Sequence, residues 1–183
     1  MIPKRLFFIW IGTKPKFVDF AISKYRSLNS DCDIQLIHYS ISQLENLYFG
    51  KSIATEIDQI VHDLIVAMLS REKYATLLTK LISGAYMINY SYTPFIQIFC
   101  DLLRIELLNV YGGIYVDCDT YPLKPFDEQL YKHEQFCVRD KVRDALVPNN
   151  YFIGSKTNNN IDDYFDDNID DIVMTNNYQF IDI

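Results

Sequence analysis

An uninterrupted apolar run, residues 6–11, lies near the start of the chain between Arg5 and Gly12. A strand that is apolar at every position is buried on both faces, which occurs in sheets covered by helices on both sides. The apolar spacing that follows predicts a helix over residues 17–28, and a second strand is expected at residues 34–39. This order of strand, helix and strand is the unit from which parallel sheets are built.

The rest of the chain continues the alternation. Ser40 and Gln43 have the spacing of a capping box. Thr93 and Pro94 are typical of the N-cap and the first turn of a helix, which the glycines at 112–113 are expected to end. Further strands are expected at residues 114–116, 135–138 and 151–153, and one or two helices within residues 52–82. We therefore predict an α/β fold with a mixed, mostly parallel sheet flanked by helices.

The negative charge of the chain is concentrated at its C-terminal end. Residues 157–183 hold seven Asp and no Lys, Arg or Glu, whereas the preceding residues carry 17 acidic and 17 basic side chains. We expect a single domain over residues 1–183, with an acidic helical tail at about 157–183. A neutral body without a basic stripe argues against nucleic acid and against an anionic membrane surface as partners.

The cysteines and the N-terminal region both favour a reducing compartment. The four cysteines are scattered, without a Cys-x-x-Cys pair, which is typical of reduced thiols. The first apolar run is too short for a signal peptide or a membrane span. We therefore expect a soluble, cytoplasmic protein with no membrane span.

Asp117 and Asp119 directly follow the short buried strand expected at residues 114–116. In open α/β sheets ligands bind beyond the carboxyl ends of the strands, so carboxylates that leave a strand there point into the ligand crevice. If the strand continued, its period of two would place Tyr115, Asp117 and Asp119 on one side. Two carboxylates suit Mg²⁺ or Mn²⁺, which take few protein ligands and complete their shells with water and substrate phosphates.

The triplet Asp-Cys-Asp occurs twice, first as Asp31-Cys32-Asp33 and later as Asp117-Cys118-Asp119. The earlier copy precedes its strand, so we expect it at the amino edge of the sheet, away from the crevice. The alternative for the later copy is structural, with Asp117 and Asp119 capping a turn before Pro122. Strand position favours the cation site and leaves this alternative open.

Three other residues are candidates for binding a nucleotide. Asp101 and Arg104 are neighbours at i and i+3 on the expected helix. They form an ordinary surface ion pair, or Arg104 binds a phosphate bidentately while Asp101 accepts hydrogen bonds from sugar hydroxyls. Trp10, near the carboxyl end of the first strand, is either a core residue or a platform for a nucleotide base.

Three segments of the chain carry a family resemblance. They are Ile2-Pro3-Lys4 with Phe8-Ile9-Trp10-Ile11-Gly12, then Asp101-Leu102-Leu103-Arg104, and then Tyr111-Gly112-Gly113-Ile114-Tyr115-Val116-Asp117-Cys118-Asp119, followed by Leu123-Lys124-Pro125. Together they resemble glycosyltransferase family 32, which includes yeast Golgi mannosyltransferases and bacterial capsular sugar transferases, with the glucosylating toxins of clostridia as more distant relatives. The resemblance implies a GT-A-like, nucleotide-sugar-binding fold and a metal-dependent glycosyltransferase that retains the anomeric configuration.

The resemblance implies a donor site built from residues distant in the sequence. Trp10 would stack on the base, and Tyr115 would line the nucleotide pocket. Asp101 and Arg104 would grip the sugar and the diphosphate and take part in catalysis. Asn150 would lie near the donor sugar.

The resemblance also implies a cofactor and partners. Asp117 would contact the ribose and assist the metal, while Asp119 would ligate Mn²⁺ or Mg²⁺ directly and serve catalysis. The donor would be a UDP-sugar or GDP-mannose. The acceptor would be a hydroxyl group on a glycan or a protein.

Two other functions stay open. The first is a catalytically reduced protein with a shortened C-terminus, which binds a nucleotide sugar without turning it over. The second is a phosphatase of the haloacid-dehalogenase type, which also places Asp-x-Asp after a hydrophobic strand. That motif has Thr or Val two residues past its second Asp, where this chain has Tyr121. Its strand also comes early in the chain, so this alternative ranks last.

Overall fold

The computed structural model describes residues 1–40, 42–43, 46, 63–64, 68, 93–142 and 145–157. Of the region where helices were expected, residues 52–82, it describes only residues 63–64 and 68, which are helical. The acidic helical tail was expected at about residues 157–183, and of this range the structure describes only Thr157.

The N-terminal part forms the expected parallel unit. β1 (Arg5–Ile11) is followed by α1 (Lys16–Leu28) and then by β2 (Asp33–Tyr39). The two strands pair in parallel along all 7 residues of each. The sequence prediction is confirmed here to within about one residue at each boundary.

Ser40 and Gln43 form the expected capping box just after β2. The Ser40 backbone N–H donates to Oε1 of Gln43 over 2.7 Å, and the Gln43 backbone N–H donates to Oγ of Ser40 over 3.2 Å. These reciprocal hydrogen bonds satisfy backbone donors at the start of a helical turn, which includes residues 42–43.

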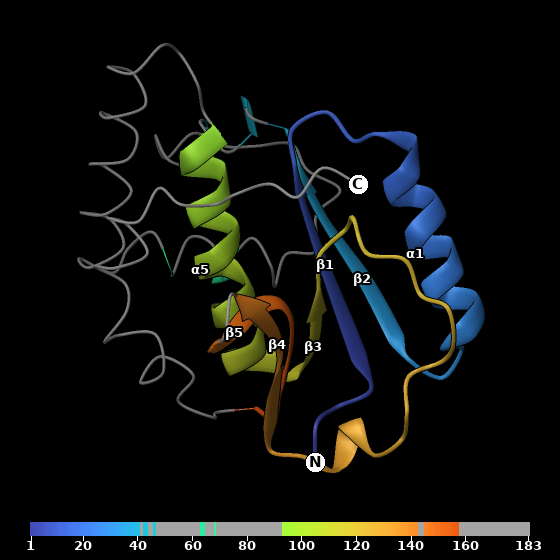
Figure 1. Cartoon of the computed structure of the whole chain (residues 1–183). Coiled ribbons are helices and arrows are strands. Elements are labelled where there is room, and N and C mark those ends of the chain that lie inside the picture. The colour runs from blue at the N-terminus through green and yellow to red at the C-terminus, as the bar shows by residue number, and fades with distance from the viewer. Residues whose placement is uncertain are drawn as a thin grey trace.

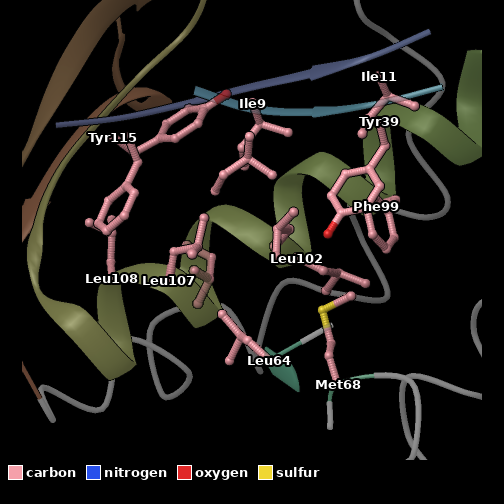
Figure 2. Close-up of a cluster of buried hydrophobic side chains, with 14 of the residues drawn as sticks. Ile9, Ile11, Tyr39, Leu64, Met68, Phe99, Leu102, Leu107, Leu108 and Tyr115 are labelled. Carbon is pink, nitrogen blue, oxygen red and sulfur yellow. The ribbon is translucent and has the colours of Figure 1, made fainter. Parts of the chain in front are cut away.

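The apolar run of β1 contributes to two cores because its side chains alternate between the faces of the sheet. Phe7 and Ile9 pack in one cluster with residues of α5 (Thr93–Tyr111), as Figure 2 shows for Ile9. Leu6 and Phe8 pack in the other cluster with residues of α1. The two helices thus cover opposite faces of the sheet (Figure 1), which explains why every position of the run is apolar.

Gly112 and Gly113 connect α5 to β3 (Gly113–Val116) through backbone that only glycine adopts readily. Their φ angles are 60° and 117°. A Cβ at Gly113 would lie 2.7 Å from the carbonyl oxygen of Arg5, and one at Gly112 would lie 2.8 Å from the backbone nitrogen of Thr157. The pair therefore ends the helix and lets β3 start directly beside β1.

The C-terminal strands differ from the sequence prediction in length. β4 (Gln135–Val142) and β5 (Ala145–Ser155) form an antiparallel hairpin, whereas only residues 135–138 and 151–153 were expected as strands. A 3₁₀ helix, η1 (Leu130–Lys132), precedes the hairpin. The sheet has the order β2-β1-β3-β5-β4, parallel in its first three strands and antiparallel thereafter. The mixed α/β architecture is as predicted.

No helix in the described part of the chain is long and apolar enough to cross a membrane.

Candidate active site

The candidate site begins where β3 ends. β3 pairs with β1 at Ile114 and Tyr115 and ends at Val116, while β1 continues to Ile11. Asp117 therefore leaves the sheet beside the carboxyl-terminal half of β1. The chain then turns, and the Thr120 backbone N–H donates to the Asp117 carbonyl over 3.1 Å. The strand does not persist, so the period of two does not extend to Asp119.

Arg104 is the centre of a compact polar cluster. Its Nη2 lies 2.5 Å from Oδ1 of Asp101, and its Nη1 lies 3.4 Å from Oδ1 of Asp117. Its guanidinium carbon lies 4.4 Å from the centre of the Tyr115 ring, which is a cation–π distance. Its Nε also donates to the Cys100 carbonyl over 3.4 Å. The structure thus brings together four of the predicted site residues: Asp101, Arg104, Tyr115 and Asp117.

The ion pair between Asp101 and Arg104 is not the surface pair that the sequence allowed. The side chain of Arg104 is only 7% exposed and that of Asp101 is 16% exposed. Removing one partner of a buried pair leaves the other charge poorly compensated. At a helix surface, solvent would compensate that charge. Helical spacing predicted that the two residues are neighbours, but not that α5 turns this face toward β3.

Burial sets the electrostatics of the cluster. It raises the pKa of Asp117, an effect opposed by Arg104 and by the hydrogen bond from Tyr115 and reinforced by the charges of Asp119 and Asp101. Burial would lower the pKa of Arg104, but Tyr115, Asp101 and Asp117 together raise it above its ordinary value. An arginine held in this way keeps its charge. Additional positive charge beside Asp117 would stabilise the ionised form of its carboxyl group.

Asp119 differs from Asp117 because it is exposed and makes no hydrogen bond or ion pair with any described residue. Among the described residues, no group of three or more His, Cys, Asp or Glu side chains forms a ready-made metal cage. Two carboxylates with open coordination positions fit Mn²⁺ or Mg²⁺, which keep waters and substrate phosphates as ligands. They fit zinc poorly, because its protein sites use three or four ligands, mostly nitrogen or sulfur.

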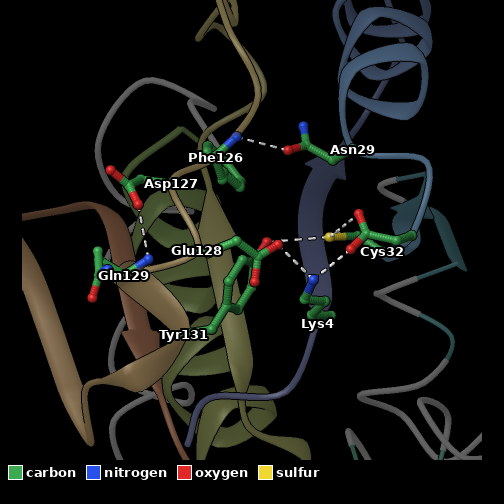
Figure 3. A network of polar contacts seen from close by, with 9 residues as sticks. Lys4, Asn29, Cys32, Phe126, Asp127, Glu128, Gln129 and Tyr131 are labelled. Carbon is green, nitrogen blue, oxygen red and sulfur yellow. Dashed lines mark hydrogen bonds and ion pairs between the residues drawn. The ribbon is translucent and has the colours of Figure 1, made fainter.

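The earlier triplet lies at the opposite end of the sheet, as predicted. Asp33 begins β2 opposite Arg5, and its Oδ2 lies 3.1 Å from Nε of Arg5. Nζ of Lys4 lies 2.5 Å from Asp31 and 2.6 Å from Glu128. Figure 3 shows Lys4 beside Glu128. Both carboxylates of this copy are therefore used in ion pairs that hold the amino edge together.

Trp10 lies on the other face of the sheet from Arg104. It is partly buried against the cluster that includes α1, and its indole N–H donates to the Thr13 carbonyl over 3.0 Å. Phe17 meets its ring edge-on, with centroids 5.8 Å apart and planes at 89°. The structure thus fixes the ring at the carboxyl end of β1 but does not bring it into the Arg104 cluster.

Asn150 lies in an irregular part of β5. Cys137 pairs with Ile153, whereas the next residue along β4, Val138, pairs with Asn149. Phe152, two residues after Asn150, pairs with Val116, the last residue of β3. The backbone of Asn150 is thus near the level at which the turn at residues 117–120, the aspartate turn, leaves the sheet. Its side chain lies outside the described part.

Sequence reasoning missed the contacts that hold the aspartate turn. The Cys118 thiol donates to the Ile9 carbonyl over 3.2 Å, and the Tyr25 hydroxyl lies 3.0 Å from Oγ1 of Thr120. These contacts join residues more than ninety positions apart in the chain. No local pattern signals them, because they depend on how β1 and α1 are placed beside the turn.

The sheet and the helices on its two faces define an α/β domain, and sheets of this kind bind ligands beyond the carboxyl ends of their strands. A family described as "Glycosyltransferase sugar-binding region containing DXD motif" matches residues 15–137, which include Arg104, Asp117 and Asp119. The chain therefore belongs to this family of DXD-motif glycosyltransferases. No curated protein matches it in sequence.

Comparison with solved structures gives two similar glycosyltransferase domains. The structure titled "PaToxG Glycosyltransferase" is 21% identical, with a TM-score of 0.61, and the match covers 97% of this chain and 63% of that one. The UDP-bound glycosyltransferase domain from the YGT toxin is 15% identical, with a TM-score of 0.45 and coverages of 97% and 65%. The chain thus spans less than two thirds of the length of either structure. The first similarity confirms the predicted GT-A-like fold.

Proposed function

We propose that this chain transfers a sugar from a nucleotide-sugar donor to a hydroxyl group of a glycan or protein, using Mn²⁺ or Mg²⁺. The observation that carries the proposal is the arrangement at the end of β3, where the exposed Asp119 follows an Asp117 that contacts Arg104 and Tyr115. Membership of a DXD-motif glycosyltransferase family supports sugar transfer as the reaction. The assignment to family 32 and the retention of anomeric configuration are part of this proposal.

The charge balance of the site supports the use of a divalent cation. Among the described residues, Asp101 and Asp117 both contact the guanidinium of Arg104, and Asp119 follows in the adjoining turn. When ionised, these four side chains together carry two net negative charges. A donor diphosphate would be repelled by this excess. A divalent cation bound by Asp117 and Asp119 would neutralise it and would stabilise the charge that develops on the leaving diphosphate.

The residues around the cation have separate roles in the proposal. Arg104 is held in place before the donor arrives, so its positive charge requires little reorganisation when the glycosidic bond breaks. Asp101 orients Arg104 and accepts hydrogen bonds from sugar hydroxyls. Tyr115 fixes Oδ1 of Asp117 and lines the nucleotide pocket. No protein nucleophile is needed if the leaving diphosphate helps to deprotonate the acceptor.

Two residues complete the proposed donor site from outside the family match. Trp10 lies at the carboxyl end of β1, where a base would be bound in an α/β sheet. We assign it the stacking platform for the base of a UDP-sugar or GDP-mannose. We also assign Asn150, in the irregular part of β5, a position near the donor sugar.

A screen for nucleotide release tests the proposal. The chain would be incubated with a panel of UDP-sugars and GDP-mannose in Mn²⁺, in Mg²⁺ and with a chelator, and free nucleotide would be measured. We expect one donor to be hydrolysed or transferred only when the cation is present. Donor binding by calorimetry without any release would instead identify a binding protein. Neither binding nor release with any donor would contradict the proposal.

A further inference from the structure

The turn that carries Asp119 is closed by one carbonyl and one threonine. The carbonyl of Asp117 accepts a hydrogen bond from the Thr120 backbone N–H over 3.1 Å. It also accepts one from the Thr120 hydroxyl over 2.6 Å. Both hydrogen bonds span the turn, so they fix the backbone between the two carboxylates that would share a cation.

A tyrosine of α1 extends this arrangement into the core. The Tyr25 hydroxyl lies 3.0 Å from Oγ1 of Thr120. Because the hydrogen of the Thr120 hydroxyl is used for the Asp117 carbonyl, Tyr25 must be the donor and Oγ1 of Thr120 the acceptor. Burial raises the pKa of Tyr25, so its hydroxyl stays protonated and remains a donor. The direction of both hydrogen bonds is therefore determined.

The ring of Tyr25 is itself held firmly. Tyr25 is 3% exposed, and its ring packs against Phe8 of β1 at 5.0 Å and against Phe126 at 5.8 Å between centroids. The position of its hydroxyl is thus set by the packing between α1 and the sheet. The aspartate turn is tied through Thr120 to the core rather than to solvent-exposed groups.

A second contact ties the turn to β1. Cys118, which is 4% exposed, donates its thiol to the carbonyl of Ile9 over 3.2 Å. This carbonyl lies beyond the part of β1 that pairs with β3. Cys118 thus keeps the chain hydrogen-bonded to β1 after β3 has ended at Val116.

We infer that Tyr25, Thr120 and Cys118 are positioning residues, which hold the turn so that Asp117 and Asp119 present their carboxylates to one divalent cation. The inference rests on the proposed function, since it assigns a purpose to the turn in cation binding. None of the three side chains needs to touch the cation or the donor. Their effect is transmitted through the backbone of the turn, in the way that outer groups orient metal ligands.

Removal of single hydroxyl groups tests the inference. Tyr25→Phe keeps the packed ring and removes only the donor to Thr120, while Thr120→Val removes both side-chain hydrogen bonds and Thr120→Ser retains the hydroxyl. Tyr131→Phe is the matched control, because its hydroxyl also lies 3.1 Å from a partner, Sγ of Cys32, but at the amino edge of the sheet. Mn²⁺ affinity would be measured by electron paramagnetic resonance, and exchange of the Thr120 amide by hydrogen–deuterium exchange.

We expect Tyr25→Phe and Thr120→Val to bind Mn²⁺ about 10-fold more weakly than the wild type, with faster exchange of the residue-120 amide. Thr120→Ser and Tyr131→Phe should match the wild type in both measurements, and far-ultraviolet circular dichroism should be unchanged throughout. Wild-type Mn²⁺ affinity in Tyr25→Phe and Thr120→Val would overturn the positioning role alone. A wild-type chain that binds neither Mn²⁺ nor any donor would overturn the proposed function, and the positioning role with it.

Discussion

The hydroxyl of Tyr115 donates a hydrogen bond of 2.7 Å to Oδ1 of Asp117. The same oxygen lies 3.4 Å from Nη1 of Arg104, whereas Oδ2 makes no hydrogen bond or ion pair with any described residue. One oxygen of the carboxylate is therefore used to orient it, and the other is available for a cation or a ribose hydroxyl. The hydrogen bond from Tyr115 should therefore affect ligand binding through the orientation of the Asp117 carboxylate.

Tyr115→Phe should weaken donor binding more than it weakens the fold. The ring and its contact with Arg104 remain, so the loss is one buried hydrogen bond, worth about 1 kcal/mol of stability. Without that bond the carboxylate of Asp117 is less well oriented, and donor affinity in Mn²⁺ should fall about 10-fold. Calorimetry and thermal unfolding would be compared with Tyr131→Phe, which should lose similar stability and no affinity. Equal donor affinity in the two variants would contradict the orienting role.

Arg104→Lys should not behave as a conservative substitution. A lysine ammonium cannot contact Asp101, Asp117 and the Cys100 carbonyl together, so the buried site loses charge-assisted hydrogen bonds, at a cost of about 2 kcal/mol. Donor affinity or turnover should fall clearly as well. Both would be measured by nucleotide-release kinetics and chemical unfolding.

Arg5→Lys is a matched control for the arginine substitution. Arg5 also pairs with a carboxylate, that of Asp33, and lies 5.7 Å from the centre of the Tyr111 ring, but it is at the amino edge. Its replacement should leave the kinetics unchanged. If Arg104→Lys also had wild-type kinetics, Arg104 would be part of a purely structural ion pair.

The only tryptophan provides a direct signal for base binding. Adding a nucleoside diphosphate with Mg²⁺ or Mn²⁺ should quench or shift the fluorescence of Trp10, and chelation of the cation should reverse the change. Base stacking is worth about 1–3 kcal/mol, so Trp10→Ala should weaken donor binding about 10-fold or more. Phe17→Leu should weaken it less, because it removes only the edge-on support of the ring.

Metal without nucleotide is the control for that signal, since Mn²⁺ quenches fluorescence by itself. An unchanged spectrum with nucleotide in both metals, together with a lower melting temperature of Trp10→Ala at unaltered donor affinity, would place Trp10 in the core and remove its assigned role.

The parallel part of the fold could be predicted because its signals are local. The apolar run of β1 and the helical spacing of α1 follow from burial and periodicity, and the two glycines at 112–113 mark a required turn. The length of the antiparallel hairpin was underestimated from the sequence. Residues 139–141 of β4 are Arg-Asp-Lys and β5 contains Pro148, so the outer half of the hairpin lacks the apolar alternation of a strand.

The candidate site could be predicted only as a set of residue types at a sheet edge. The sequence did predict that the two Asp-x-Asp copies lie at opposite ends of the parallel strands, because the first copy precedes its strand and the second follows its strand. The burial of Arg104 could not be predicted, since helical spacing gives neighbours but not the orientation of a helix on a sheet. The roles of Tyr25 and Cys118 depend on contacts between distant segments, which no local pattern encodes.

We propose that Asp117-Cys118-Asp119, and not Asp31-Cys32-Asp33, serves a cation-dependent sugar transfer. Asp119→Asn and Asp33→Asn make the same chemical change at the two ends of the sheet. Asp119 is exposed, and Asp33 forms a half-exposed ion pair with Arg5, so neither change should unfold the protein.

The most direct measurement is Mn²⁺-dependent nucleotide release from the preferred donor by these two variants and the wild type, with circular dichroism as the check on folding. We predict that Asp119→Asn abolishes release while Asp33→Asn retains the wild-type rate. Equal loss of release in both folded variants, or wild-type release by Asp119→Asn, would contradict the assignment of the cation site to Asp117 and Asp119.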